Sequence, residues 1–269
     1  MSHPNDASRR AFLLAASATT VTAFGTSVWA LPGGNDAGQQ LPTRDSLLKF
    51  NRDGSVRAFA GNTVICHLPQ QCAMRDATVA LHEDLAKSAF RSKLALLPAE
   101  SLHMTVFPGA NDQDRTISGW PSDVPLTASI EECNRVVGER MNRFQLDCQL
   151  PLRVRVDTKR TLDYGRACTL RMSPADDVEN LKLRNLRDSL AEVYRFRLKD
   201  HSSYEFHITV AYQMTPFSAM EKDAYTSILE THLPRIVAAA PVLELGIPEF
   251  CTFKDMYRFD VQKILSTKA

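Results

Sequence analysis

The sequence has almost no excess of charge of either sign, since 32 lysine and arginine residues stand against 31 aspartate and glutamate residues and the formal net charge is +1. A protein that holds a long duplex nucleic acid by charge needs a strongly basic face, so we expect no such partner. The sequence also has no Gly-x-Ser-x-Gly, no phosphate-binding P-loop and no dinucleotide fingerprint. These absences argue against the enzyme classes built on those turns. A small anionic ligand held by a few local groups remains compatible with the charge balance.

Cysteine is sparse, with six residues in 269 and no Cys-x-x-Cys pair. This density is far below that of a disulfide scaffold. An oxidising compartment would allow a disulfide, but the spacing defines no pairing. Cys66 and Cys168 fall at core-facing positions of expected strands, where we expect buried thiols.

Long apolar runs are also missing. The N-terminal stretch SRRAFLLAASATTVTAFGTSVWA begins with Arg9 and Arg10, and its modestly apolar run is too short and too polar for a good transmembrane helix. Residues 1–30 resemble a twin-arginine export signal with a small-residue cleavage site at Ala30. We therefore expect a periplasmic or secreted protein without stable membrane anchoring after cleavage, and the alternative is an uncleaved N-terminal anchor. Residues 31–57 are expected to be a linker and an N-terminal extension.

A repeated polar pair divides the rest of the chain. His103 and Thr105 occur in ESLHMTVFPG, and His207 and Thr209 occur in YEFHITVAYQ, at an offset of 104 residues (207 − 103). At the same offset, GNTVICHLP matches GRACTLRMS in character, and each is a glycine followed by a strand-like run. Each half carries a helical stretch between this run and its motif, and another helix and strand-like run after the motif. The chain therefore reads as a duplicated unit.

The repeat predicts the fold class. We expect an α+β protein with two pseudo-symmetric β-α-β-α-β lobes, about 58–160 and 161–262, on either side of a central cleft. Together they form one bilobal domain at 58–262. The composition, 44% hydrophobic and 23% charged, supplies ample core for it, and we expect a monomer.

Strand geometry predicts where the polar pairs point. Alternate residues of a strand share a face, so the His and Thr of each motif point to one side while their apolar neighbours point into the core. Two such strands related by a pseudo-two-fold would face their polar pairs into a common cleft. His67 and Arg171 lie at matching positions on the companion strands. They line the same cleft if those strands border the motif strands, and the alternative is an ordinary cross-strand polar pair.

The residue types in the motifs suit acid–base chemistry on a phosphate. One neutral histidine can deprotonate an attacking water or hydroxyl, while a second, protonated histidine gives a proton to the leaving oxygen. Threonine hydroxyls can hydrogen-bond phosphate oxygens, and Arg171 can add a charge-assisted contact. Phosphoryl transfer depends mainly on positioning and charge stabilisation, and this arrangement offers both without a metal.

Two H-x-[TS]-h motifs (h, apolar) on strands of a duplicated α+β unit resemble the 2H phosphoesterase superfamily, which includes 2′-5′ RNA ligase-like proteins and cyclic nucleotide phosphodiesterases. The resemblance covers most of residues 58–262 and rests on LHMTV at 102–106 and FHITV at 206–210. It implies that the two lobes carry antiparallel sheets facing the central cleft. GNTVICHLP and the ending PEFCTFKDMYRF look more like an uncharacterised bacterial and fungal branch.

The resemblance implies roles for the motif residues. His103 and His207 would be the catalytic pair, and Thr105 and Thr209 would hold the phosphate. It also implies metal-free and cofactor-free opening of a 2′,3′-cyclic phosphate, or cleavage of a related ribose phosphodiester. A nucleotide or another small phosphodiester is the expected partner.

Two other classes stay open at this point. One is a periplasmic binding protein that holds a nucleotide or a phosphorylated small molecule in the same cleft without turnover. The other is a metal-dependent hydrolase with His67, His103 and His207 as ligands, against which stands the lack of a carboxylate at a clear ligand spacing.

Overall fold

The computed structural model describes residues 41–165 and 167–267, so the predicted export signal at 1–30 and residues 31–40 lie outside the described residues. The helices are α1 (Arg44–Lys49), α2 (Ala73–Lys87), α3 (Ile130–Arg143), α4 (Thr158–Asp163), α5 (Asp177–Tyr194) and α6 (Ala219–Ala239), with short 3-10 turns η1 (Arg91–Lys93) and η2 (Ala99–Ser101). The strands are β1 (Gly61–His67), β2 (Leu94–Leu96), β3 (His103–Asn111), β4 (Arg153–Val156), β5 (Ala167–Pro174), β6 (His207–Gln213), β7 (Leu243–Glu244), β8 (Glu249–Asp255) and β9 (Arg258–Ile264).

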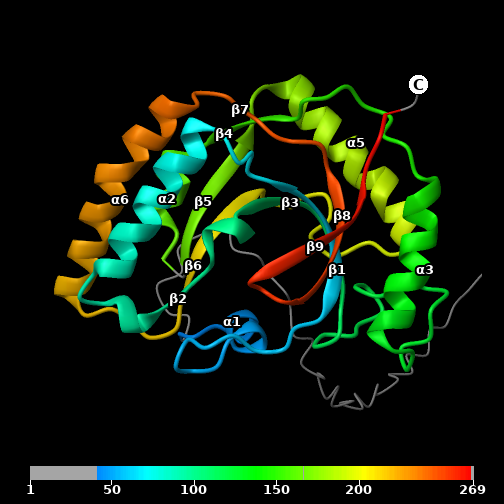
Figure 1. Ribbon diagram of the computed structural model, residues 1–269, viewed down its shortest axis with the longest axis horizontal. Helices are drawn as coiled ribbons and strands as arrows, with labels where there is room; N and C mark the ends of the chain where they lie inside the picture. Colours follow the sequence, from blue (N-terminus) through cyan, green and yellow to red (C-terminus); the bar gives the residue numbers. More distant parts are fainter. Residues whose placement is uncertain (1–40, 166, 268–269) are drawn as a thin grey trace, which may run out of the picture.

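Within these residues the strands form one nine-stranded sheet in the order β7-β4-β5-β6-β3-β1-β8-β9, and β2 pairs with β6 outside this path. The pairs are antiparallel, and the sheet curls into a half-barrel (Figure 1). The predicted α+β class with antiparallel strands is therefore confirmed. The predicted pair of separate lobes is not established, because strands of both halves are hydrogen-bonded in one sheet. The two motif strands meet where β3 pairs with β6 through Met104 and Ile208, and the halves are also joined where β4 pairs with β5 and where β1 pairs with β8.

The long helices pack against one face of this sheet in two pairs. α2 lies beside α6, and α3 lies beside α5 (Figure 1). Their N-termini are set by local chemistry, since Ser129, Asp176 and Ser218 each accept a hydrogen bond from the backbone N–H three residues later. One face of α5 is apolar and buried, including Leu183 and Leu190 at 0% exposure. The main core lies between these helices and the sheet.

The strand alternation predicted from the sequence is confirmed over both motifs. Leu102, Met104 and Val106 are buried against the helices, whereas the motif residues between them are only half-buried. Beyond each motif the alternation changes, because each motif strand carries one extra residue. On β3 the extra residue lies between Thr105 and Phe107, which pair with Ile65 and Val64. On β6 it lies between Thr209 and Ala211, which pair with Thr169 and Cys168.

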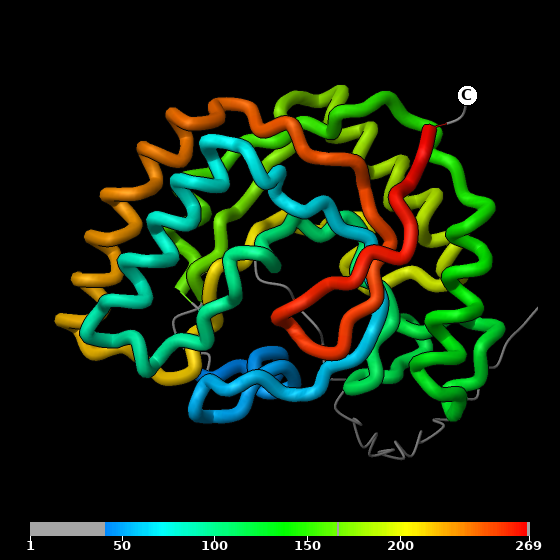
Figure 2. The backbone as a smooth tube through the Cα atoms, in the orientation of Figure 1, coloured from blue at the N-terminus to red at the C-terminus, as the bar shows by residue number. Residues whose placement is uncertain are grey.

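The described part of the predicted linker and extension is folded. Residues 41–60 contain α1 and run beside the β8–β9 hairpin (Figure 2), where the Phe59 N–H donates to the Lys254 carbonyl at 2.8 Å. A second apolar cluster joins this segment to the sheet, and its buried members are Phe50, Phe59, Ala95, Leu97, Met214, Phe253 and Met256. The N-terminal segment is therefore packed onto the opposite side of the fold from the long helices.

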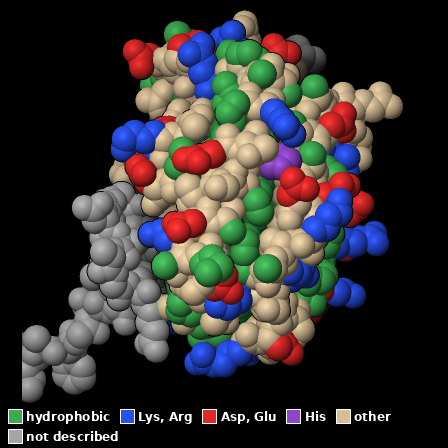
Figure 3. Space-filling model, turned by 90° about the vertical axis from the view of Figure 1, so that its left-hand side faces the viewer, with side chains coloured by type: hydrophobic (Ala, Val, Ile, Leu, Met, Phe, Trp, Pro, Cys, Tyr) green, Lys and Arg blue, Asp and Glu red, His purple; other side chains and the backbone are tan. Residues whose placement is uncertain are grey.

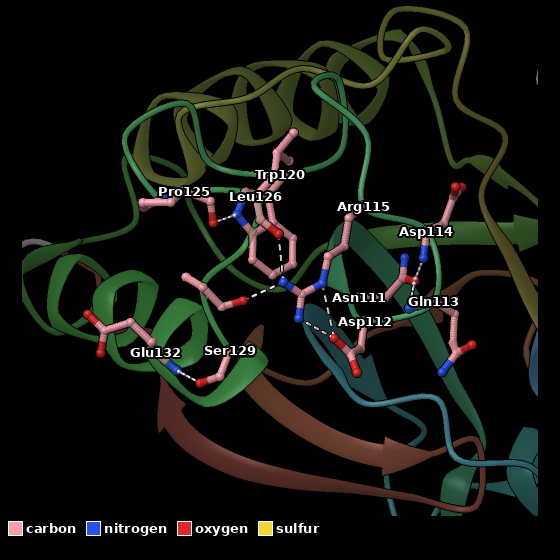
Figure 4. Close-up of polar contacts among 11 residues, drawn as sticks. Asn111, Asp112, Gln113, Asp114, Arg115, Trp120, Pro125, Leu126, Ser129 and Glu132 are labelled. Atoms are coloured by element: carbon pink, nitrogen blue, oxygen red, sulfur yellow. Dashed lines mark hydrogen bonds and ion pairs between the residues drawn. The ribbon is translucent and has the colours of Figure 1, made fainter.

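The loop from β3 to α3 is fastened by Arg115 (Figure 4). Its guanidinium pairs with Asp112, donates to the carbonyls of Leu126 (2.7 Å) and Ala128, and lies 4.6 Å from the ring centroid of Trp120. One side chain thus fixes a long connection that has no strand or long helix of its own.

The outer face over α2 and α6 carries acidic and basic side chains interspersed among apolar ones (Figure 3). Among the helices that the structure describes, none combines the length and the apolar character needed to cross a membrane. All six cysteines lie in the described ranges, and each is a free thiol. Cys66 and Cys168 are buried, as predicted.

Candidate active site

The two His-x-Thr motifs lie on adjacent central strands. Met104 pairs with Ile208 in an antiparallel register, so His103 stands beside Thr209 and Thr105 stands beside His207. Each histidine is therefore accompanied by the threonine of the other motif. Side chains that alternate with buried apolar residues point away from the long helices, to the concave side of the half-barrel.

The companion strands border the motif strands, as the predicted position of His67 and Arg171 requires. His67 pairs directly with His103 across β1 and β3, and Arg171 pairs directly with His207 across β5 and β6. The ring centroids of His67 and His103 are 6.3 Å apart. The sheet thus brings all six residues proposed from the sequence onto four consecutive strands, β5-β6-β3-β1.

Both motif histidines have the same local hydrogen bond, which defines their tautomer. Nδ1 of His103 lies 2.6 Å from the carbonyl oxygen of Ser101, and Nδ1 of His207 lies 2.8 Å from the carbonyl oxygen of Glu205. A carbonyl only accepts, so Nδ1 carries the hydrogen in each neutral ring and Nε2 is left with its lone pair. Each ring therefore presents Nε2 as a proton acceptor.

Burial and neighbouring cations keep both rings neutral at physiological pH. Burial, together with His67, His207 and Lys49, lowers the pKa of His103 to about 4, against a raising contribution from the Ser101 carbonyl. Burial, Arg171 and Lys49 lower the pKa of His207 to about 3. At the His207 ring the effect of Arg171 and Lys49 is larger than that of Asp45, and such a field favours the binding of an anion.

Arg171 is held by contacts on both sides of its guanidinium. Its Nη2 pairs with the carboxylate of Glu205, which also pairs with Arg160, and its guanidinium carbon lies 5.0 Å from the ring centroid of Tyr164. Glu205 therefore supports the site twice, since its carboxylate orients Arg171 and its backbone carbonyl orients His207.

A hollow of about 180 Å³ adjoins this end of the site. Arg160, Arg184, Tyr204 and Glu205 are among its lining residues. The hollow shares Glu205 with the site, and its lining also includes Met172 and Phe206, which lie next to Arg171 and His207 in the sequence.

Three further contacts come from segments that carry no motif, and sequence reasoning missed them. Glu249 of β8 lies 2.5 Å from Nδ1 of His67 through Oε2. The ring of Phe259, from β9, lies 4.3 Å from the ring of His103, centroid to centroid, at 62°. Lys49, from the last turn of α1, reaches the hydroxyl of Tyr212 on β6 at 3.3 Å. Only the fold brings these residues to the motifs, and no spacing in the sequence signals them.

The residues that the structure describes contain no group of three or more His, Cys, Asp and Glu side chains arranged to hold a metal ion. His67, His103 and His207, the ligands of the metal-dependent alternative, do not form such a group among them.

A comparison with known protein families matches part of the chain. Residues 49–163 match the family model 2H-phosphodiest, described as a domain of unknown function (DUF1868), which confirms the resemblance to the 2H phosphoesterase superfamily. The matched range contains the first motif, and the second motif lies beyond it. A 2H phosphoesterase-like domain indicates a hydrolase of phosphodiesterase type.

The fold also resembles that of a solved protein. The crystal structure of a conserved protein of unknown function, ATU0111 from Agrobacterium tumefaciens str. C58, superposes with a TM-score of 0.75 at 29% identity, covering 84% of this chain and 94% of that chain. No curated protein matches the chain.

Proposed function

We propose that this protein is a metal-independent phosphodiesterase that acts on a 2′,3′-cyclic phosphate or a related small (ribo)nucleotide phosphodiester. The observation that carries the proposal is the matched setting of His103 and His207. Each ring presents Nε2 from the same tautomer, and each stands beside the threonine of the other motif. A phosphate between them would meet an acid–base group on either side and a hydroxyl donor beside each.

The reaction follows from these groups. Nε2 of the neutral histidine takes a proton from water as the water oxygen bonds to phosphorus. The bond from phosphorus to one ribose oxygen breaks, and the other histidine, protonated on Nε2, gives that oxygen its proton. Thr105, Thr209 and Arg171 would hold the non-bridging oxygens, whose charge grows in the transition state. The product is a phosphomonoester, and the two histidines have exchanged their protonation states.

Substrate binding would allow the acid to take its proton from the solvent. Both rings are neutral in the free protein because burial and cations lower their pKa values. A bound phosphodiester is an anion, which stabilises an imidazolium beside it. We therefore expect proton uptake when the substrate binds, and a pH–rate profile that belongs to the coupled pair rather than to one histidine.

The proposal includes a symmetry between the two halves of the fold. We propose that the halves are copies of one duplicated unit and that their strands alternate within the single sheet. In support, β1 pairs with β3 as β5 pairs with β6, and the register changes at Val64 and at Cys168, which are 104 residues apart (168 − 64). A chance resemblance of two motifs would not explain matching irregularities in the companion strands.

Export is proposed on the N-terminal sequence alone. We propose that Arg9 and Arg10 belong to a twin-arginine signal that delivers a periplasmic or secreted monomer. Changing both to lysine in the full chain should retain the protein in the cytoplasm, and unchanged export would reject the proposal.

The function is tested with the protein from residue 31 and the four 2′,3′-cyclic nucleoside monophosphates in EDTA. The His103→Ala/His207→Ala double variant should form no product, whereas His82→Gln, a change of a histidine on α2, should retain wild-type turnover. Each single variant should lose most of kcat, because the remaining histidine can serve as acid or base but not as both.

Product that depends on added zinc or manganese would reject the metal-free mechanism. Tight binding without product, unchanged in His103→Gln and His207→Gln, would instead identify a non-catalytic binding protein.

A further inference from the structure

His67 is a half-buried histidine on the concave side of the sheet, where a carboxylate holds its ring. Cys66 and Leu68, its neighbours on either side, belong to the main core between the sheet and the long helices. The side chain of His67 therefore points to the opposite face, as the motif residues do. Its Nδ1 lies 2.5 Å from Oε2 of Glu249 on β8. The two side chains are 23% and 20% exposed, so a small ligand can reach them.

The contact with Glu249 defines which nitrogen of His67 is available to a ligand. A carboxylate only accepts, so Nδ1 carries the hydrogen. The two nitrogens of an imidazole point in widely different directions, so Nε2 points away from Glu249 and from β8. On the side of β1 away from β8 lies β3, where His103 is the register partner of His67 and the ring centroids are 6.3 Å apart. Nε2 of His67 is therefore left for a ligand at the first motif.

The second half of the chain has a matching arrangement. Arg171 lies 104 residues after His67 (171 − 67), is the register partner of His207, and pairs with the carboxylate of Glu205. Each motif histidine thus has a residue that can carry positive charge on the next strand, and a glutamate holds that residue. The halves differ in one respect. A guanidinium is always charged, whereas an imidazole becomes charged only when it takes up a proton.

We propose that His67 is a second cation of the phosphate site, which Glu249 orients and which becomes charged when a phosphate binds. The proposal rests on the proposed function, which places a phosphate between the motifs. The ring would lie between two anions, the Glu249 carboxylate at Nδ1 and the phosphate at Nε2, and both favour the imidazolium. The proton comes from the solvent onto Nε2, which then donates a charge-assisted hydrogen bond to a phosphate oxygen. No covalent bond to phosphorus changes in this step.

Glu249 is the charged group in direct contact with His67. The titratable groups that act on this pair or on its direct neighbours include His103 on β3, His207 on β6, Cys66 on β1, Cys148 between α3 and β4, Cys251 on β8, Lys49 on α1 and Asp260 on β9. Burial lowers the pKa of the two histidine rings and raises the pKa of the three thiols, so these five groups are uncharged at neutral pH.

The binding test uses inorganic phosphate as the probe and measures its affinity by calorimetry. His67→Gln should weaken binding about tenfold, the effect of one lost hydrogen bond from a charged donor. Glu249→Gln keeps an acceptor oxygen but removes the charge, and it should also weaken binding. Since Glu249 acts through His67, Glu249→Gln should add less than twofold in the His67→Gln background. Losses that multiply in the double variant would overturn the proposal, as would a wild type that does not bind phosphate.

A second pair of a histidine and a carboxylate supplies the control. Nε2 of His232 on α6 lies 2.8 Å from Oδ2 of Asp84 on α2, on the helical side of the sheet. Asp84→Asn removes the same charge from the same kind of contact and should leave the phosphate affinity unchanged. An equal loss of affinity in Asp84→Asn and Glu249→Gln would show that Glu249 has no specific role in the site.

An arginine in place of His67 tests the role of the proton. His67→Arg should retain at least half of the wild-type affinity for phosphate, because it supplies a permanent charge at this position. The ratio of the wild-type affinity to that of His67→Arg should fall as pH rises, because only the wild type must bind a proton together with the phosphate. The titration of phosphate itself cancels in this ratio. A ratio that is independent of pH would contradict the proposal.

A readout without turnover separates this proposal from the proposed function. In NMR spectra above neutral pH, added phosphate should shift the side-chain nitrogens of His67 toward those of an imidazolium in the wild type, and less so in Glu249→Gln. If no cyclic nucleotide is hydrolysed but this shift is seen, the reaction is wrong and the second cation stands. If cyclic nucleotides are hydrolysed and the His67 ring does not change with phosphate bound, the proposal for His67 fails on its own.

Discussion

The ring of Phe259 lies against the ring of His103, with centroids 4.3 Å apart and planes at 62°. Phe259 belongs to β9, and its ring also lies 5.2 Å from that of Phe253 on the neighbouring strand. The β8–β9 hairpin therefore forms an aromatic wall beside the first motif histidine. This wall limits the rotation of the imidazole and removes water from one of its sides.

Removing this wall should change catalysis more than folding. Phe259→Ala should raise the pKa of His103, because burial is the largest cause of its low value. It should also lower kcat about tenfold, because the imidazole loses one constraint on its orientation. Phe259→Leu keeps an apolar group and should retain most of kcat. NMR titration of His103 with steady-state kinetics checks both effects, and an unchanged pKa in Phe259→Ala would contradict the role of the wall.

The low histidine pKa values predict a specific loss of stability in acid. Each ring has a pKa below the 6.5 of an unfolded chain, about 4 for His103 and about 3 for His207. Between these values and 6.5 the unfolded chain binds protons that the folded protein excludes, so stability is lost as pH falls through this window. For His103 the loss in the free energy of unfolding over this window is about 3 kcal/mol.

Thermal unfolding of the wild type and of the His103→Gln/His207→Gln variant tests this loss of stability in acid. The carboxylates titrate equally in both proteins, so a difference between them reports the two histidines. The wild type should lose more of its melting temperature between pH 6.5 and pH 4.5. Parallel curves would show that the histidines titrate normally.

Arg171 should contribute to catalysis through its positive charge and through a direct contact with the phosphate. Arg171→Met should lower kcat/KM about 100-fold, as expected for the loss of a buried charged donor to a phosphate. It should also raise the pKa of His207, since Arg171 is the main cause of the low value after burial. Arg160→Met is the matched change, because Arg160 shares Glu205 but is not the register partner of His207. Equal losses in both variants would assign the effect to Glu205 instead.

Gly109 should be intolerant of even a methyl group. A Cβ there would lie 2.2 Å from Oδ1 of Asn62 and 2.3 Å from its carbonyl oxygen, and Oδ1 already accepts from the Ala110 N–H at 3.1 Å. Gly109→Ala should therefore destabilise the fold by about 1–3 kcal/mol. Gly165→Ala has nothing within 4 Å of the added atom and should leave stability unchanged within about 0.5 kcal/mol. Urea unfolding of both variants tests the contrast.

The two motifs could be placed from the sequence because strand alternation and the constant offset are local signals. The alternation correctly put Met104 and Ile208 in the core and their motif neighbours on the other face. It fails at Phe107, which plain alternation places with Thr105 on the concave face. Phe107 is fully buried and stacks on Tyr194 at 4.7 Å, because the extra residue at Val106 turns it to the helices.

The rest of the site could not be read from the sequence for a different reason. Lys49, Glu249 and Phe259 belong to no repeat, and their neighbours show no pattern that points to a cleft. They reach the motifs through tertiary packing, which joins residues 41–60 and the β8–β9 hairpin to the central strands. The single continuous sheet was not predicted for the same reason. Nothing in the sequence of one half specifies which strand of the other half will pair with its outer strands.

The pairing of β1 with β8 has a consequence for synthesis. Gly61, at the start of β1, is the partner of Phe253, which follows 192 residues later (253 − 61). A ribosome that has completed only the first half has released β1 and β3, but the segment that closes one side of β1 does not yet exist. The half-made protein exposes an open strand edge that can pair with other chains. The sheet is complete around β1 only once β8 has been made, so during synthesis β1 keeps this open edge until residues 249–255 have emerged.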